Sequence, residues 1–330
     1  MDDPFARYLP TLEAYLRRIV HRDALPLYGM LAYHLGWVDT TFRPLAEPKR
    51  GKRLRPVLLL LVSEAQGGDW HEALPAAAAV ELLHNFSLIH DDIEDGDRMR
   101  RGRPTLWTLW GKAQAINAGD TLYTLACESL LALPDALVPE ALHHFTEAAR
   151  MLTEGQHLDM AFERMEAVDE ATYLRMVAGK TAALIALSAW LGGLCAGANA
   201  ATLTALERFG HNVGMSFQMQ DDILGLWGDP RRTGKPVGND LRQRKKTLPI
   251  IHGMAHSEAF RRLLARPHLD DEAVAQAQAL LEATGSRAYV EARAADYLRR
   301  GLEALEEAGG SGEAKEALHT LVQRLLGRDQ

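Results

Sequence analysis

Two acidic clusters are the residues of this chain whose types and spacing point most clearly to chemistry. The first is HDDIED at residues 90–95, and the second is QMQDD at residues 218–222. Each cluster ends an apolar run with helical spacing, where unpaired carboxylates would be costly. Asp91 and Asp95 would share one face of a helix, and like charges that close destabilise it unless a cation lies between them. The clusters therefore predict a binding site for a hard divalent metal.

Three loops rich in basic residues accompany these clusters, at residues 40–53, 96–105 and 227–246. Mg²⁺ is usually bound by one or two carboxylates together with substrate phosphates, and Arg and Lys bind the remaining phosphate oxygens. Carboxylates and bases together predict a substrate that carries a diphosphate. The sequence has no Gly-rich Walker loop, no Ser-His-Asp elbow and no zinc-binding His-Glu-x-x-His pattern, so none of these three reaction types is indicated.

The composition narrows the class of protein further. The chain has 330 residues, is 47% apolar and carries a net charge of −7, so no overall positive field would attract nucleic acid. Its two cysteines, Cys127 and Cys195, stand in apolar helical contexts, which predicts buried free thiols in a reducing compartment. The first residues lack a basic segment followed by an apolar stretch, so we expect a cytoplasmic protein without a signal peptide.

Leu, Ala, Glu and Arg dominate the sequence, and alternating runs of Val, Ile and Thr are nearly absent, which predicts an all-α fold. Pro75 suits the first turn of the helix that carries the first acidic cluster, and Asp169 is a plausible N-cap. We expect one domain over residues 1–330, with N-terminal helices in 1–50, the motifs in 51–250 and C-terminal helices in 251–330. The expected helices are 9–22, 24–37, 54–66, 75–95, 117–133, 139–165, 169–197, 200–226, 245–256, 257–265, 271–284, 286–308 and 313–327.

One segment is long enough to cross a bilayer, because no charged residue occurs between Ala182 and Leu206. The segment also contains Ser188, Asn199, several glycines and many alanines, so its hydrophobicity is modest. This composition favours a helix buried in a protein core, and we expect no transmembrane segment.

The motifs and their order resemble the trans-isoprenyl diphosphate synthases, head-to-tail prenyltransferases with an all-helical fold around a central active-site cavity. The resemblance covers roughly residues 50–250. The matching stretches are GKRLRP at 51–56, ELLH at 81–84, DDIED at 91–95, RRGRPT at 100–105, GKTA at 179–182, QMQDD at 218–222, and GDP at 228–230 followed by TGK at 233–235, Asp240 and Lys245.

The resemblance implies a role for each matching position. The metal ligands would be Asp91, Asp95 and Asp221, which would hold Mg²⁺ ions, three when substrate is bound, with Asp92 and Asp222 supporting them. Residues expected to bind the allylic diphosphate are Arg100, Lys180, Gln218 and Lys235, with Thr181 beside them. Residues expected to bind isopentenyl diphosphate are Lys52, Arg55, His84 and Arg101, and Lys245 would close the mouth of the site. Lys180 and Lys235 would act in catalysis together with the three metal-binding aspartates.

In the reaction that the resemblance implies, metal ions and cationic side chains stabilise the departing diphosphate while an allylic carbocation forms. The alkene of isopentenyl diphosphate attacks that cation, and a proton is then lost, for which the released diphosphate is the expected acceptor. Apolar helices keep water from the cation. One position departs from the pattern: Gly225 stands where the family's second motif often has a third Asp.

Product length and reaction class have open alternatives. Phe86 matches an aromatic position of many geranylgeranyl diphosphate synthases, and with the small Ser87 it is the candidate floor for the growing chain. Helix geometry alone favours Ser87 and Leu88 instead, since Phe86 lies about 140° from Asp91. A farnesyl or somewhat longer product is the nearest alternative. A class I terpene cyclase, or a non-catalytic subunit of a synthase, would fit the bases and the intact acidic motifs less well. Family members are usually homodimers, and we expect the same here.

Overall fold

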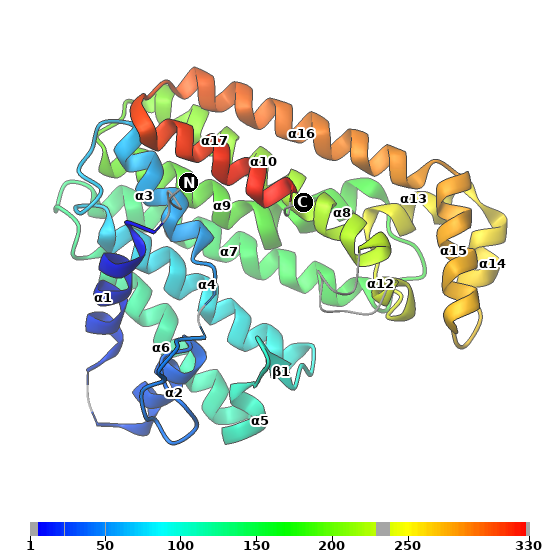
Figure 1. The fold of residues 1–330 in the computed structure, drawn as a ribbon, viewed down its shortest axis with the longest axis horizontal. Coiled ribbons are helices and arrows are strands. Elements are labelled where there is room, and N and C mark those ends of the chain that lie inside the picture. The colour runs from blue at the N-terminus through cyan, green and yellow to red at the C-terminus, as the bar shows by residue number, and fades with distance from the viewer. Residues whose placement is uncertain (1–5, 23, 50, 229–237, 328–330) are drawn as a thin grey trace. The chain divides into compact units, whose positions relative to one another are not determined.

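The computed structural model describes residues 6–22, 24–49, 51–228 and 238–327, and it is helical nearly throughout (Figure 1). This confirms the all-α fold predicted from composition. The described part of the chain contains one small sheet, a pair of two-residue strands. The chain divides into two compact units that alternate along the sequence. The first comprises Met1–Ala149, Leu187–Glu207 and Ala308–Leu321, and the second comprises Arg150–Ala186, Arg208–Glu307 and Val322–Gln330. The prediction of one domain stays a prediction.

The first unit is built around helix α4 (Leu74–Glu94), which packs on α1, α3 and α6. Every residue from Leu74 to Leu83 is buried, because helices surround this part of α4. Towards the carboxyl end of α4, where the acidic cluster lies, the buried residues lie along one side of the helix only. Pro75 stands in the first turn, as predicted. The other helices of this unit are α1 (Leu9–Val20), α2 (Pro26–His34), α3 (Leu54–Ala65), α5 (Leu106–Trp110) and α6 (Lys112–Leu130).

A short β-hairpin follows α4, in a stretch predicted to be a loop. Strands β1 (Met99–Arg100) and β2 (Arg103–Pro104) are antiparallel, with Arg100 paired to Arg103. The two residues between them, Arg101 and Gly102, have φ values of 52° and 70°. A two-residue loop with both φ values positive is the type I′ turn that hairpins favour. This turn carries Arg101 at its tip.

The second unit contains the second acidic cluster, near the end of α10 (Ala200–Trp227). Its core includes Tyr173, Met215, Met219, Leu248 and Val290. The expected helix over 169–197 is three consecutive pieces, α8 (Glu170–Val177), a π-helix η1 (Ala178–Ala182) and α9 (Ala183–Cys195). Its predicted N-cap is confirmed, since Asp169 accepts a hydrogen bond from the Thr172 backbone N–H at 2.7 Å.

The remaining helices agree with the expected segments to within a few residues, apart from the short α12, which was not predicted. They are α7 (Val138–Phe162), α12 (Asn239–Arg242), α13 (Leu248–His256), α14 (Glu258–Leu264), α15 (Asp271–Ala283), α16 (Ser286–Ala308) and α17 (Gly312–Gly327). Among the described residues, one stretch, Glu170–Cys195, is long and apolar enough to cross a membrane, and 89% of its most apolar window is buried. Such burial is what we expected of a core helix.

Candidate active site

The carboxylates of the first acidic cluster, at the end of α4, differ in their exposure to solvent. Asp95 is exposed and Asp91 is partly exposed, whereas Asp92 is buried and only 2% exposed. The buried carboxylate accepts a hydrogen bond from Arg100 Nε at 2.7 Å, which ties the hairpin to α4. Burial raises the pKa of Asp92 to about 6, although Arg100 opposes the shift. Asp92 thus supports the structure, while Asp91 and Asp95 lie on the more accessible side.

Basic side chains gather around the hairpin, and we call them the cation cluster: Lys49, Arg55, Arg100 and Arg101, with His34 and His84 beside them. A small hollow in the first unit is lined by four of these residues, together with Arg103 and Asp92. Gly51 makes room for the cluster, because a Cβ at this position would lie 2.7 Å from the Arg101 guanidinium. Several guanidinium groups packed this closely repel one another, so the arrangement favours binding of an anion with several charges.

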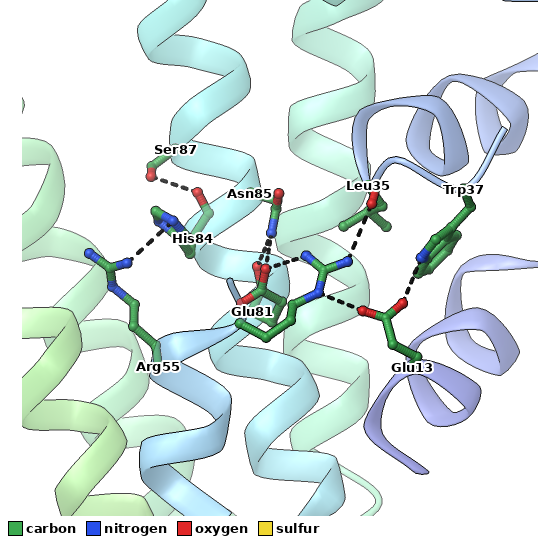
Figure 2. A network of polar contacts seen from close by, with 9 residues as sticks. Glu13, Leu35, Trp37, Arg55, Glu81, His84, Asn85 and Ser87 are labelled. Carbon is green, nitrogen blue, oxygen red and sulfur yellow. Dashed lines mark hydrogen bonds and ion pairs between the residues drawn. The ribbon is translucent and has the colours of Figure 1, made fainter. Parts of the chain in front are cut away.

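Arg55 and His84 meet within the cation cluster, as Figure 2 shows. Arg55 Nη1 lies 3.3 Å from His84 Nε2, so the arginine donates and the imidazole is a neutral acceptor. Burial lowers the pKa of His84 well below its ordinary value, and Arg55, Arg101 and Arg100 lower it further. Burial also lowers the pKa of Arg55. Two of the residues predicted to bind isopentenyl diphosphate are therefore in contact, and Arg101 is close enough to act on His84.

In the second unit, hydrogen bonds join two residues of the predicted allylic-diphosphate set, Thr181 and Gln218, to the second acidic cluster. Thr181 Oγ1 donates to Gln218 Oε1 at 2.8 Å, and Gln218 Nε2 donates to Asp222 Oδ1 at 3.0 Å. Lys180 Nζ lies 2.5 Å from Asp159 Oδ2. Asp221, next in sequence to the buried Asp222, is exposed. The second acidic cluster thus resembles the first, because each combines accessible carboxylates with a buried one: Asp221 is exposed here, and Asp222 is buried.

The buried carboxylate of the second cluster organises its surroundings. Asp222 Oδ2 accepts hydrogen bonds from the Tyr173 hydroxyl at 2.5 Å and from the Leu248 backbone N–H at 2.9 Å. Burial raises the pKa of Asp222 to about 7, while these donors and Gln218 oppose the shift. The carboxylate therefore ties α8 and the start of α13 to α10.

Glycines bring the backbones of the second unit close enough for these contacts. A Cβ at Gly179 would lie 2.4 Å from the Met151 carbonyl oxygen, and one at Gly155 would lie 2.2 Å from the Lys180 nitrogen. A Cβ at Gly214 would lie 2.5 Å from Ala182 Cα. Because Gln218 is one turn beyond Gly214 on the same face of α10, this close approach lets it contact Thr181. The π-helix itself is a local irregularity of a type often found at functional sites.

Gly225 stands where the family's second motif often has a third Asp, and a carboxylate from another helix occupies the space beside it. A Cβ at Gly225 would lie 2.0 Å from Asp240 Oδ2, so the carboxylate of Asp240 occupies the space beside this glycine. Lys245 is exposed, and its backbone N–H donates to the Asp240 carbonyl at 2.9 Å. Lys235, predicted to bind the allylic diphosphate, lies outside the described residues. The second cluster thus has a third carboxylate nearby, contributed by α12.

The carboxylates fit a magnesium ion that is shared with a substrate. Among the described residues, no three His, Cys, Asp or Glu side chains converge closely enough to form a complete metal site. Mg²⁺ characteristically takes one or two carboxylates and completes its shell with water and phosphate oxygens, whereas a structural metal site supplies most ligands itself. A pair such as Asp91 and Asp95 therefore suits Mg²⁺ that arrives with a diphosphate.

The chain-length candidates lie on α4, one turn before Asp91. The Phe86 ring packs on His90 and on Tyr123 of α6, with ring centroids 4.7 Å and 5.4 Å apart. The Ser87 hydroxyl donates to the backbone carbonyl of His84 at 2.9 Å. Phe86 therefore faces α6, and Tyr123 stands behind it.

Comparison with known proteins decides the family. The Polyprenyl synthetase family model matches residues 37–283. The chain belongs to this family. A (2E,6E)-farnesyl diphosphate synthase of Mycobacterium bovis is 42% identical over 322 residues, covering 94% of this chain and 89% of the relative. A geranylgeranyl diphosphate synthase of Mycobacterium tuberculosis is 46% identical over 252 residues, covering 76% of this chain and 72% of the relative.

Solved structures agree with this assignment. A polyprenyl synthetase from Streptomyces coelicolor superposes with a TM-score of 0.90 at 36% identity, covering 97% of this chain and 98% of the other. A geranylgeranyl pyrophosphate synthetase from Pyrococcus horikoshii gives 0.89 at 34% identity, covering 98% of each chain. The protein is thus a prenyltransferase of the trans-isoprenyl diphosphate synthase family, and the resemblance inferred from the motifs is confirmed.

Sequence reasoning missed the contribution of the first fifty residues to this site. His34 lines the hollow beside Arg100 and Arg101, and Arg103 donates hydrogen bonds to the carbonyls of Tyr33 and Val38 at 3.0 Å and 2.6 Å. Burial, together with Arg101 and Arg100, lowers the pKa of His34 well below its ordinary value. A histidine without a motif around it carries no signal in one sequence, so these contacts could be found only in the folded chain.

Proposed function

We propose that this prenyltransferase condenses isopentenyl diphosphate with allylic diphosphates in a Mg²⁺-dependent reaction, and that its main product is geranylgeranyl diphosphate. The observation that carries the proposal is the cation cluster, where Arg55 contacts His84 and Arg101 acts on the same imidazole. His84 lies on α4 about two turns before Asp91, so these bases accompany the first acidic cluster. An enzyme that only ionised one allylic diphosphate would have no use for this second set of bases.

The residues have distinct roles in the proposed reaction. Arg55 and Arg101 bind the diphosphate of isopentenyl diphosphate, and neutral His84 accepts from Arg55 and so holds its guanidinium in place. Lys180, Thr181 and Gln218 bind the allylic diphosphate. Bound Mg²⁺ would neutralise charge on the leaving diphosphate, and Asp91, Asp95 and Asp221 would be its protein ligands.

Support for a twenty-carbon product comes from Phe86. Its ring is held between His90 and Tyr123, so it cannot swing aside without losing both aromatic contacts. A farnesyl product remains the second candidate, because a relative that is 42% identical over 94% of this chain is a farnesyl diphosphate synthase.

The test is an incubation of purified protein with Mg²⁺, isopentenyl diphosphate and one primer at a time: dimethylallyl, geranyl or farnesyl diphosphate. The proposal expects a twenty-carbon chain from all three primers, and consumption of isopentenyl diphosphate that ends when a chelator removes the metal. An Asp91→Asn variant is the matched control for background turnover. Farnesyl diphosphate left unextended would instead establish a fifteen-carbon product. Cyclic products without isopentenyl consumption, or no turnover at all, would overturn the proposal.

A further inference from the structure

A buried ion-pair network lies beside the Arg55–His84 contact of the cation cluster (Figure 2). Arg53, the N-cap residue of α3, is fully buried and extends its guanidinium between two glutamates from different helices. Its Nε donates to Glu13 of α1 at 2.8 Å, and its Nη1 donates to Glu81 of α4 at 2.6 Å. Its Nη2 donates to the Leu35 carbonyl, which follows α2, at 3.3 Å. One side chain thus joins α1, α2, α3 and α4.

Both glutamates are held by further donors, as the dashed lines of Figure 2 show. Trp37 Nε1 donates to Glu13 Oε2, and Asn85 Nδ2 donates to Glu81 Oε1, each at 2.7 Å. Their side chains are 9% and 3% exposed, so the network lies away from water. A buried ion pair stabilises little in itself compared with apolar packing, but it holds its partners in a single geometry.

Because Arg53 lies next to the predicted substrate-binding residues in the sequence, the way it is held also fixes their positions. Arg53 has a left-handed backbone, with φ 53° and ψ 33°, a conformation that a non-glycine residue keeps only when its surroundings hold it. Lys52 immediately precedes Arg53, and Arg55 follows two residues after it. On α4, Glu81 stands one turn before His84, so the Arg53–Glu81 contact sets the register in which Arg55 meets His84.

The network also has a net negative charge, since two carboxylates face one guanidinium. Glu81 acts on the cation cluster, because its charge raises the pKa of Arg55 and of Arg101 against the effect of burial. The network therefore supplies both the geometry and the counter-charge for cations that face one another without a bound anion.

We infer that Arg53, together with Glu13 and Glu81, is a positioning device for the isopentenyl diphosphate site, through which helix α1 controls affinity for that substrate without touching it. The inference rests on the proposed function, which places isopentenyl diphosphate at Arg55 and Arg101. It assigns a role to the N-terminal helix, which contains none of the family motifs.

The first test variant is Glu13→Gln, which leaves Arg53 paired with Glu81 and so keeps the chain able to fold. Arg53→Met removes the anchor, and Arg53→Lys restores its charge without the planar fork. The matched control is Leu16→Ala, which removes a fully buried side chain from the same helix and leaves the network intact. Isopentenyl diphosphate alone supports no turnover, so its Kd can be measured by titration calorimetry. The Kd of a non-ionising thio-diphosphate analogue of the allylic substrate is measured alongside with Mg²⁺.

The expected result is a rise of about tenfold in the Kd for isopentenyl diphosphate in Glu13→Gln, with the Kd of the allylic analogue within about twofold. Arg53→Met should raise the Kd for isopentenyl diphosphate further, and Arg53→Lys should raise it less than Arg53→Met does. Leu16→Ala should bind both compounds as the unaltered protein does. An unchanged Kd in Glu13→Gln, an equal loss for both compounds, or the same loss in Leu16→Ala would overturn the inference. Turnover of the unaltered protein is assayed separately, and its absence would refute the proposed function alone.

Discussion

Replacing Gly179 by Ala should both destabilise the protein and impair use of the allylic substrate. This glycine lies in the π-helix η1, immediately before Lys180. A Cβ there would be 2.4 Å from the Met151 carbonyl oxygen of α7, where a carbon–oxygen contact needs about 3.3–3.6 Å. The obstructing atom belongs to a backbone, so no side-chain rotation can relieve the overlap, and η1 must move by about 1 Å.

The size of the effect follows from that movement. Overpacking a close contact costs about 1–3 kcal/mol, and the better helix propensity of Ala returns up to about 1 kcal/mol. Lys180 moves with the backbone, since its own nitrogen lies against Gly155 on the facing helix. A misplacement of about 1 Å in a substrate-binding group can lower the rate about a hundredfold. We therefore expect kcat/KM for the allylic substrate to fall about 10- to 100-fold.

Steady-state kinetics at saturating isopentenyl diphosphate and denaturant unfolding measure the two effects. Gly301→Ala is the matched control, because it makes the same change in helix α16, where the new Cβ would lie 3.2 Å from the Cγ2 of Val213. A side-chain methyl can yield by a few tenths of an ångström, so this variant should keep its activity and gain slightly in stability. If Gly179→Ala behaved like Gly301→Ala in both assays, the argument that η1 is positioned by backbone contact would be wrong.

Three further outcomes are expected. Phe86→Ala should shift the products to longer chains by five-carbon units, with Tyr123 as the next barrier, and an unchanged product profile would refute the assignment of Phe86 as the floor. The depressed pKa values of His34 and His84 mean that the unfolded chain binds more protons than the folded one below about pH 6.5. Stability should therefore fall as pH decreases below that value, by up to about 1.4 kcal/mol per pH unit for each histidine. Urea unfolding of His84→Asn should show a shallower pH slope, and an identical slope would contradict the low pKa. Both free thiols are partly rather than fully buried, unlike the prediction from their apolar contexts. Burial still raises the pKa of Cys195 to about 12, so this thiol should resist iodoacetamide at pH 8 until the protein unfolds, as mass spectrometry of the labelled peptides would reveal.

Local pattern was enough to predict the elements that carry the chemistry. Helical periodicity and composition indicated α4 and α10, and the choice of carboxylates over histidine or cysteine indicated a hard metal. The short hairpin at Met99–Pro104 escaped prediction, since each strand has two residues and Arg103 is held by carbonyls of residues 33 and 38. The π-helix was missed for a similar reason, because its shape depends on how Gly155 and Gly179 meet.

What the sequence determined by itself was therefore the all-α fold and the family, since each depends on residue types and spacings within single segments. Metal binding by Asp91 and Asp95 is predicted on the same grounds and stays a prediction. Tertiary structure alone decided which neighbours surround the candidate residues within each unit: Arg53 anchored between Glu13 and Glu81 in the first, and Asp240 beside Gly225 in the second. The physical reason is that the apolar pattern of a helix predicts which of its faces will be buried. The pattern does not predict which residues of other helices will contact that face. Those contacts are set by the packing of backbones whose positions depend on the whole unit.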